Sequence, residues 1–205
     1  MKGLSLFSNV GLAETYLSEI GLDIVVANEL LDERAMFYTH LYPKCNMIKG
    51  SITDPDIYDS VISLSKSLEV DFIIATPPCQ GMSIAGHNSK YDERNNLIKY
   101  AVDAILDLKP KFVFLENVTQ QLVTPIIYHG EEIKIPDYLH RRLDDEYNFN
   151  QNCITNSMYY GVPQRRERAI FLLVRKDIDY KWEFPAPEKQ VTLETAFQGI
   201  PDLWP

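Results

Sequence analysis

Short apolar runs alternate with longer helix-like segments along this chain, and no other feature constrains the fold as strongly. Apolar runs of about four to eight residues bounded by Gly, Pro or Asn are typical of buried strands. Strands and helices in alternation predict an α/β fold, with a mostly parallel, twisted sheet and helices on both faces. We expect strands near 3–7, 23–28, 72–75, 111–116, 149–155 and 169–174, and helices near 12–20, 32–41, 57–68, 97–108 and 136–143. Residues 119–130 show no clear period and receive no expected element.

One of these strands ends in a loop that presents a thiol. The run 72–75 is followed directly by Thr76-Pro77-Pro78-Cys79-Gln80-Gly81. Because the two prolines fix φ and remove two amide donors, the backbone that leads to Cys79 is stiff and extended. Open α/β sheets hold their ligands at the carboxyl ends of strands, so Cys79 is a candidate nucleophile. The alternative is a buried structural cysteine, which is the commoner fate of a free thiol.

Two further strand ends carry charged side chains. The apolar run 112–115 ends in Glu116-Asn117-Val118, and the run 169–174 follows Gln164-Arg165-Arg166-Glu167-Arg168. Alternation along a strand would point Arg166 and Arg168 to one face. Taken singly, a glutamate and two arginines are more typical of a solvated set of ion pairs. Their placement at strand ends, like that of Cys79, favours a shared crevice.

In this order and at this spacing the three motifs resemble the nucleophile, carboxylate and arginine motifs of the DNA (cytosine-5) methyltransferase family. Residues 92–97 (Asp-Glu-Arg-Asn-Asn-Leu) resemble the element that follows the family's catalytic loop. The resemblance extends from about Leu4 to Leu203. It implies the Rossmann-like fold of methyltransferases that depend on S-adenosylmethionine.

The resemblance implies a reaction on a cytosine that is flipped out of double-stranded DNA. Cys79 would add to C6 of the base and thereby make C5 able to accept a methyl group, while Glu116 would hold N3 from a protonated carboxyl. Arg166 and Arg168 would bind O2 of the base, or a neighbouring phosphate or carboxylate. The base that removes the C5 proton is not identified. DNA contacts are expected from Gln80, Ser83, Asn117 and Val118.

The methyl donor is expected at the first strand. There a strand, a tight turn at residues 8–11 and a helix begin a nucleotide-binding unit. Glu29 follows the second strand, where an acidic residue suits the ribose hydroxyls of a nucleoside cofactor; otherwise it is one of the acidic residues at the start of the next helix. By resemblance the cofactor is S-adenosylmethionine, and its expected contacts are Phe7, Ser8, Asn9, Gly11, Leu12, Glu29, Ser51, Ile52, Pro77 and Leu97.

Several cofactor positions depart from the family pattern. The family usually carries an acidic residue at the position of Ser5 and glycines at those of Asn9 and Leu12, and a further acidic residue at that of Ser51. Asn tolerates a left-handed backbone better than most residues, so Asn9 can still form the turn. Leu12 is less compatible with a close approach of the backbone to the methionine moiety. These changes bear on cofactor affinity and leave the fold unaffected.

The chain resembles only the first part of the family. Members continue beyond the arginine motif through a target-recognition region and two more motifs, whereas this chain stops soon after residues 191–197, which resemble the short helix before that region. We therefore expect a single domain, residues 1–205, that is the catalytic subunit of a two-chain enzyme of a restriction-modification system, or a fragment of a longer chain. The net charge of −9 is unfavourable for binding DNA alone, because phosphate contacts dominate affinity. The second polypeptide, which would carry the recognition region, is expected to be basic.

Two other functions remain open. The chain could be an inactive member that serves as an assembly or regulatory subunit, with Ser5, Leu12 and Ser51 as signs of decay, or it could methylate cytosine in RNA. The three cysteines and four histidines show no metal-ligand spacing, so no metal is expected. An odd number of cysteines without an export signal, and no apolar run of membrane-spanning length, predict a cytoplasmic protein without membrane contact.

Overall fold

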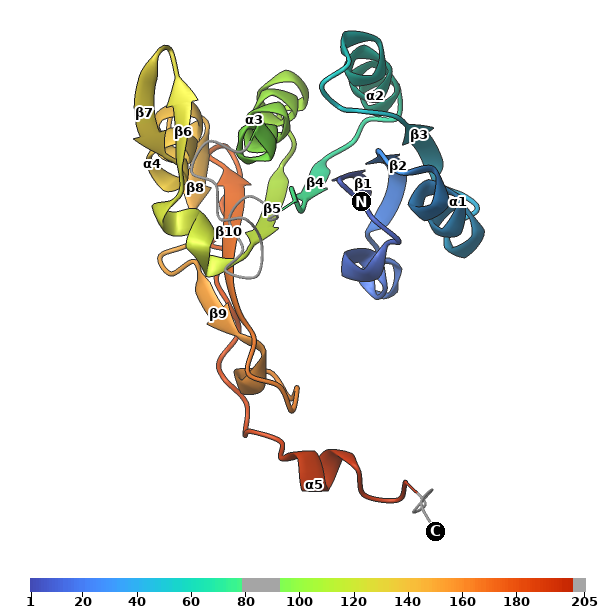
Figure 1. Ribbon diagram of the computed structural model, residues 1–205, viewed down its shortest axis with the longest axis vertical. Helices are drawn as coiled ribbons and strands as arrows, with labels where there is room; N and C mark the ends of the chain where they lie inside the picture. Colours follow the sequence, from blue (N-terminus) through green and yellow to red (C-terminus); the bar gives the residue numbers. More distant parts are fainter. Residues whose placement is uncertain (79–92, 201–205) are drawn as a thin grey trace.

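The computed structural model describes residues 1–78 and 93–200, and within these residues eight strands form one sheet. The strand order is β3-β2-β1-β4-β5-β10-β8, with β9 paired to β10 (Figure 1). The sheet strands are β1 (Lys2–Leu6), β2 (Asp23–Glu29), β3 (Asn46–Lys49), β4 (Phe72–Ala75), β5 (Phe112–Asn117), β8 (Tyr147–Phe149), β9 (Ile154–Asn156) and β10 (Glu167–Arg175). The hairpin strands β6 (Pro125–Tyr128) and β7 (Glu131–Lys134) pair with each other. The helices are α1 (Asp32–Leu41), α2 (Pro55–Ser67), α3 (Leu97–Leu108), α4 (Ile135–Leu143) and α5 (Leu193–Ala196), and the 3₁₀ helices are η1 (Leu12–Glu14), η2 (Leu17–Ile20), η3 (Glu93–Asn96), η4 (Thr119–Val123) and η5 (Ser157–Tyr159).

The order of the parallel strands determines where a ligand can bind. β3, β2, β1, β4 and β5 are parallel, and β10 closes the series as an antiparallel neighbour of β5. The chain moves outward from β1 to β2 and β3, then returns through α2 to β4 on the other side of β1. The order therefore reverses between β1 and β4, and in open α/β sheets the crevice at the carboxyl ends of such a pair is the ligand site.

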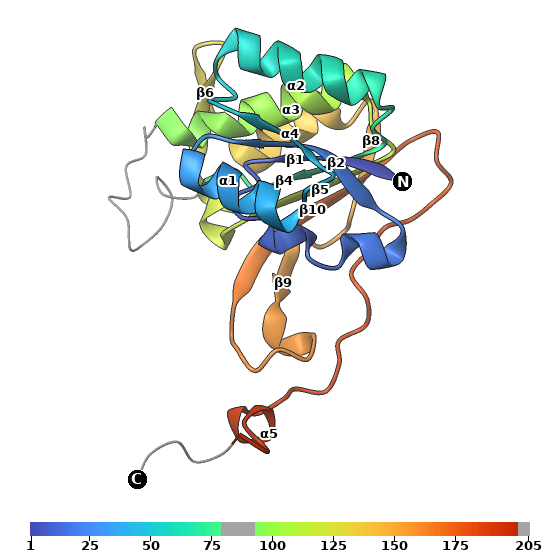
Figure 2. The ribbon, with the colours of Figure 1, turned by 90° about the vertical axis from the view of Figure 1, so that its right-hand side faces the viewer.

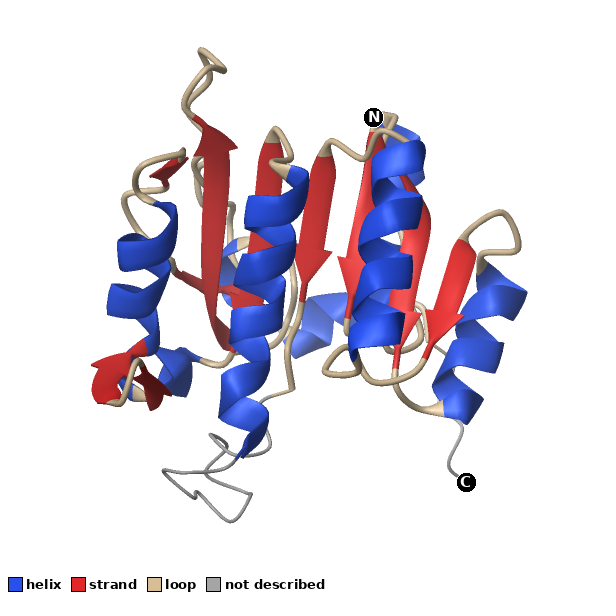
Figure 3. Ribbon diagram, turned by 90° about the horizontal axis from the view of Figure 1, so that it is seen from above, coloured by secondary structure: helices blue, strands red, loops and turns tan. Residues whose placement is uncertain are grey.

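Alternating side chains bury both faces of the sheet. On β4, Ile73 and Ala75 join the larger core cluster, which α2, α3 and α4 cover, whereas Phe72 and Ile74 join a second cluster on the opposite face. Figure 2 shows α2 and α3 on one side of the sheet and α1 on the other, and Figure 3 shows helices running alongside the strands. Part of the second face is covered by an irregular segment instead of a helix of the described residues. There Trp182 packs against Phe112 at 5.8 Å between ring centroids, and also against Phe72 and Phe114.

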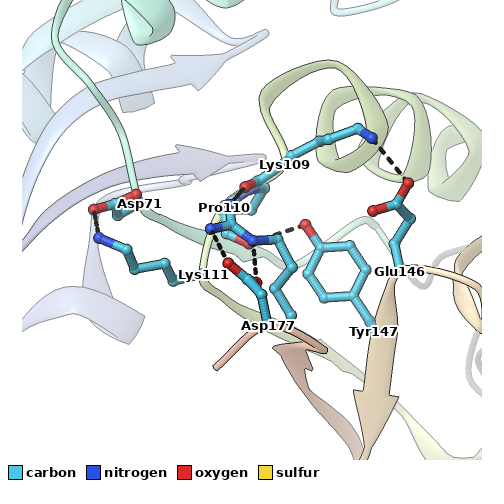
Figure 4. A network of polar contacts seen from close by, with 8 residues as sticks. Asp71, Lys109, Pro110, Lys111, Glu146, Tyr147 and Asp177 are labelled. Carbon is cyan, nitrogen blue, oxygen red and sulfur yellow. Dashed lines mark hydrogen bonds and ion pairs between the residues drawn. The ribbon is translucent and has the colours of Figure 1, made fainter. Parts of the chain in front are cut away.

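A polar network fastens the sheet at the edge opposite the carboxyl ends of the parallel strands (Figure 4). It connects the starts of β4, β5 and β8 with the end of β10, through side chains and carbonyls around Lys111 and Arg175. Lys111 pairs with Asp71 at 2.6 Å, Arg175 with Asp177 at 2.6 Å and with the Lys109 carbonyl, Lys109 with Glu146 at 2.8 Å, and Tyr147 donates to the Pro110 carbonyl at 2.9 Å. Its ion pairs are part-exposed, so each contributes little to the stability of the fold.

The expected α/β fold is confirmed, and so are most of its elements. The expected helices at 32–41 and 97–108 match α1 and α3 residue for residue, and those near 57–68 and 136–143 match α2 and α4 within two residues. β3 and the β6–β7 hairpin were not expected. β3 offers only Met47 and Ile48 between two polar residues, a pattern too short to show a period.

Two expected elements are wrong. The strand expected near 149–155 is two strands, β8 and β9, with Asn150 between them. The Asn150 side chain donates to the carbonyls of Asn152 and Ile170 and accepts from the Leu172 amide at 3.0 Å, so it takes the place of part of the backbone ladder there. The helix expected at 12–20 is the pair η1 and η2, because Glu14 turns inward to bond with buried hydroxyls while its neighbours face solvent.

Candidate active site

Two hydrogen bonds fix the segment that leads to Cys79. The Thr76 hydroxyl donates to the Phe7 carbonyl at 3.1 Å, which ties the end of β4 to the turn after β1. The buried Asn117 side chain donates from Nδ2 to the Pro77 carbonyl at 3.0 Å and accepts the Val118 amide at 2.8 Å. Pro77 is thus held between the ends of β1 and β5, next to both parts of the expected site. Cys79, Gln80 and Ser83 lie outside the described residues.

Glu116 and Arg168 meet at the carboxyl end of β5. The Arg168 Nε lies 2.9 Å from the Glu116 Oε1, and the two side chains are 20% and 26% exposed. The antiparallel register, which pairs Glu116 with Ile170, brings the start of β10 beside the end of β5. The structure therefore brings these two predicted groups into direct contact.

Arg166 lies apart from this pair. It precedes β10, its side chain is exposed, and its backbone amide donates to the Asn156 Oδ1 at 3.2 Å. Within the described residues, the arginine in contact with Glu116 is Arg168. The role expected for Arg166 therefore stays a prediction.

A cavity of about 310 Å³ lies at the carboxyl ends of β1, β2 and β4. Six of the ten residues expected to bind the cofactor line it: Phe7, Asn9, Glu29, Ser51, Ile52 and Leu97. Arg34, Thr76 and Arg94 also line it, and the sequence did not single them out. The cavity occupies the position between β1 and β4 at which the strand order reverses.

Glu29 forms one wall of this cavity and organises the backbone around it. Its Oε2 accepts the amide of Asn9 and its Oε1 accepts the amide of Leu31, both at 2.9 Å. Asn9 has φ of 52°, so the expected left-handed turn at this position is confirmed. A carboxylate has about four acceptor sites, so two bonds to amides leave capacity for a ligand.

The other four expected cofactor residues have different surroundings. Ser8 bonds through its amide and hydroxyl to the Asn28 carbonyl, the Leu12 side chain is 78% exposed, and Pro77 is engaged by Asn117. Gly11 has φ of 79°, and a Cβ there would overlap the ring of Tyr42, whose hydroxyl donates to the Gly11 carbonyl at 2.7 Å. Gly11 is therefore required by the packing of the turn against α1, and none of the four lines the cavity among the described residues.

Sequence reasoning missed two buried polar groups near the cavity. Glu14 accepts the hydroxyls of Ser5 and Tyr38 and is 4% exposed. Asn95, between the cavity residues Arg94 and Leu97 in the sequence, is 2% exposed, and within residues 1–78 and 93–200 neither polar atom of its side chain has a hydrogen-bond partner. Nothing in the local sequence indicates that either side chain is buried.

The burial of Glu14 predicts a dependence of stability on pH. Desolvation raises the pKa of its carboxyl above the ordinary 4.5, and burial also raises the pKa of the titratable groups that face it, Tyr38 and Cys45. The folded state then holds a proton that the unfolded state has lost, so stability falls as the pH rises from about 4.5 through the raised pKa. Glu14→Gln has no carboxyl at this position, so its stability lacks this dependence on pH. We expect urea unfolding at a series of pH values to show wild type losing stability relative to Glu14→Gln across that window, and a pH-independent difference would contradict it.

Comparison with known proteins identifies a family for this chain. A family model described as C-5 cytosine-specific DNA methylase matches residues 1–204. The chain belongs to this family. It is 39% identical over 206 residues to the Type II methyltransferase M1.HgaI of Avibacterium volantium, covering 98% of this chain and 57% of that protein. It is 28% identical to the Type II methyltransferase M.XorII of Xanthomonas oryzae pv. oryzae, with 98% and 46% covered.

A solved structure supports the fold. A prophage-encoded Escherichia coli protein, assigned as a DNA modification methyltransferase, matches with a TM-score of 0.76 at 23% identity over 99% of this chain and 56% of that one. The family member described here thus has the Rossmann-like methyltransferase fold, and it spans about half the length of the curated relatives it matches. No helix in the described ranges is long and apolar enough to cross a membrane. Nor do those ranges contain a group of three or more His, Cys, Asp or Glu side chains that could hold a metal ion.

Proposed function

We propose that this chain is the catalytic and cofactor-binding part of an S-adenosylmethionine-dependent enzyme that methylates C5 of cytosine in DNA. The observation that carries the proposal is the Glu116–Arg168 pair at the carboxyl end of β5, beside the fixed segment that leads to Cys79. The cavity at β1, β2 and β4 opens at the same edge of the sheet. A methyl donor and an activated base could therefore meet there.

The residues of the cavity fit an adenosine-bearing cofactor. Phe7, Ile52 and Leu97 supply apolar surface for a base, and Glu29 supplies a carboxylate for ribose hydroxyls. Asn9, Ser51 and Thr76 add polar side chains to the same lining. Bound S-adenosylmethionine would supply an electrophilic methyl group.

The chain's own residues would prepare the base. We assign the attack on C6 to the thiolate of Cys79, which forms an S–C6 bond and moves electron density to C5. The protonated carboxyl of Glu116 would donate a hydrogen bond to N3, give its proton to N3 as charge develops during the addition, and take it back when Cys79 leaves; Arg168 would pair with the carboxylate in between. After methyl transfer, removal of the C5 proton restores the double bond and expels Cys79. Arg166, Gln80, Ser83, Asn117 and Val118 stay candidates for contacts to the base or to DNA.

A second part of the enzyme is needed for DNA recognition in this proposal. The net charge of −9 disfavours binding to DNA by this chain alone, and the curated relatives are about twice as long. Exposed apolar side chains also gather on α1 and the turn before it, on a region we name the α1 surface: Leu30, Leu31, Met36, Phe37 and Leu41. A helix that is apolar on both its sheet-facing and outer sides is typical of an element covered by further protein.

Methyl transfer tests the proposal directly. Tritiated S-adenosylmethionine is incubated with mixed-sequence duplex DNA, and in parallel with RNA of matching sequence, using this chain alone and this chain with the product of its neighbouring gene. We expect incorporation into DNA with the mixture. Incorporation into RNA only would mean that the substrate is RNA and not DNA. Activity of the chain alone would exclude an obligatory second part. No incorporation under any condition would contradict the proposal.

The α1 surface gives a separate prediction. Phe37 and Leu41 lie one turn apart on α1 and are 52% and 48% exposed, so replacing both by Glu should leave the fold intact. We expect the double variant to self-associate less than wild type. When the second part is added, its methyl-transfer activity should be lower than that of wild type by about tenfold or more. Sedimentation velocity and the tritium assay measure the two effects. Ile127→Glu is the matched control, because Ile127 is also exposed but lies on β6, far from α1 (Figure 1).

A further inference from the structure

Glu14 is a carboxyl group buried between the first strand and the first helix of the sheet's second face. Its Oε1 accepts the hydroxyl of Ser5, which lies on β1, and its Oε2 accepts the hydroxyl of Tyr38, which lies on α1. Ser5 and Tyr38 are themselves 2% and 0% exposed. A single side chain from η1 thus connects β1, which precedes the turn Phe7–Gly11, to α1, which follows it.

Tyr38 also connects this cluster to the turn Phe7–Gly11. The Tyr38 ring packs against that of Tyr42 at 4.8 Å between centroids, and the Tyr42 hydroxyl donates to the Gly11 carbonyl at 2.7 Å. Both rings lie so close to Gly11 that a Cβ would contact them. Gly11 in turn donates to the Ser8 carbonyl at 2.9 Å, which closes the turn that presents Asn9 to Glu29.

The turn needs such support, because its backbone is unfavourable. Phe7, Asn9 and Gly11 all have positive φ, at 58°, 52° and 79°, and only glycine adopts this region without cost. Phe7 and Asn9 line the cavity, so any relaxation of the turn moves cavity residues.

We propose that Glu14 is a positioning residue for cofactor binding: through Ser5 and Tyr38 it fixes the left-handed turn Phe7–Gly11 in the shape that forms the cavity. This role rests on the proposed function, since it assigns the cavity to S-adenosylmethionine. Glu14 does not itself line that cavity.

Three variants and one control test the role. Glu14→Ala leaves the Ser5 hydroxyl without this acceptor and the Tyr38 hydroxyl with only the Cys45 sulfur, at 3.8 Å. Glu14→Gln keeps the volume and one acceptor, and its NH2 group can donate to the second hydroxyl oxygen, so both hydroxyls keep a hydrogen bond. Tyr38→Phe removes one bond and keeps the ring, and it serves if Glu14→Ala fails to fold. Glu19→Gln, on the exposed side of η2, is the matched control.

Two measurements are made on each variant. Hydrogen exchange, followed by mass spectrometry on the peptide that spans residues 7–11, reports the turn without any cofactor. Calorimetry with S-adenosylmethionine, on the chain together with its second part where that is required, reports affinity. We expect Glu14→Ala to speed exchange in the turn and weaken binding by about tenfold or more, Tyr38→Phe to do both to a smaller extent, and Glu14→Gln and Glu19→Gln to match wild type.

The outcomes separate this inference from the proposed function. Turn exchange and affinity unchanged in both Glu14→Ala and Tyr38→Phe would overturn the role of Glu14. A defect in Glu14→Gln as large as in Glu14→Ala would also overturn it, because keeping the volume and the hydrogen bonds of the side chain would then not preserve the turn. Faster turn exchange in a chain that binds no S-adenosylmethionine even as wild type would retain the structural part and reject the cofactor assignment.

Discussion

Glu116→Gln is expected to lower the rate of methyl transfer by about 10²–10⁴-fold, the range typical of losing a positioned acid. The substitution keeps the size, and its amide can still donate a hydrogen bond to N3 of the base, but it cannot give N3 a proton, and it removes the negative charge that pairs with Arg168 at 2.9 Å. Single-turnover transfer from tritiated S-adenosylmethionine, with saturating DNA and the second part present, measures the chemical step.

The geometry also predicts what Glu116→Gln leaves unchanged. Glu116 is not among the residues that line the cavity, so the affinity for S-adenosylmethionine should equal that of wild type. Glu131→Gln is the control, because Glu131 is an exposed carboxylate on β7, in a hairpin that is separate from the sheet that carries Glu116. A Glu116→Gln enzyme with an unaltered single-turnover rate would remove Glu116 from the chemistry and leave its bond to Arg168 as a structural contact.

The fold was largely predictable because its strands are local signals. Runs such as 72–75 and 112–115 are apolar on both faces, which identifies strands of a sheet covered on both sides. What was missed depends on contacts between distant residues. The break between β8 and β9 exists because the Asn150 side chain bonds to Leu172 and Ile170, and nothing within residues 149–155 signals that interaction.

The candidate site was predictable in its strand-end residues and less so in its turn. Strand direction alone brings Glu116 toward Arg168, and it gathers Phe7, Glu29 and Ile52 at one cavity. The sequence assigned Gly11 to the cofactor, whereas the structure shows it packed against Tyr42, a residue 31 positions away. Glu14 was overlooked because a glutamate in an expected surface helix gives no sign that it points inward.

Cys79→Ser is expected to abolish methyl transfer, with a loss of about a thousandfold or more. A thiol with a pKa of about 8.5 supplies some thiolate near neutral pH, whereas a serine hydroxyl without an adjacent general base supplies almost none, so addition to C6 becomes very slow. Affinity for S-adenosylmethionine should persist, because Phe7, Glu29 and Leu97 line the cavity independently of the thiol. The tritium assay and calorimetry measure these two quantities on the same preparation.

A duplex that contains 5-fluorocytosine distinguishes a covalent role from a structural one. After addition of Cys79 and methyl transfer, C5 carries fluorine in place of the proton, and because fluorine cannot leave as a cation the S–C6 bond persists. Wild type and the control Cys153→Ser, a half-buried thiol beside β9, should therefore form a DNA adduct that survives denaturing electrophoresis, and Cys79→Ser should form none. An adduct with Cys79→Ser would assign the nucleophile to another residue. Its absence from wild type, under conditions in which ordinary cytosine is methylated, would mean that transfer proceeds without the covalent step.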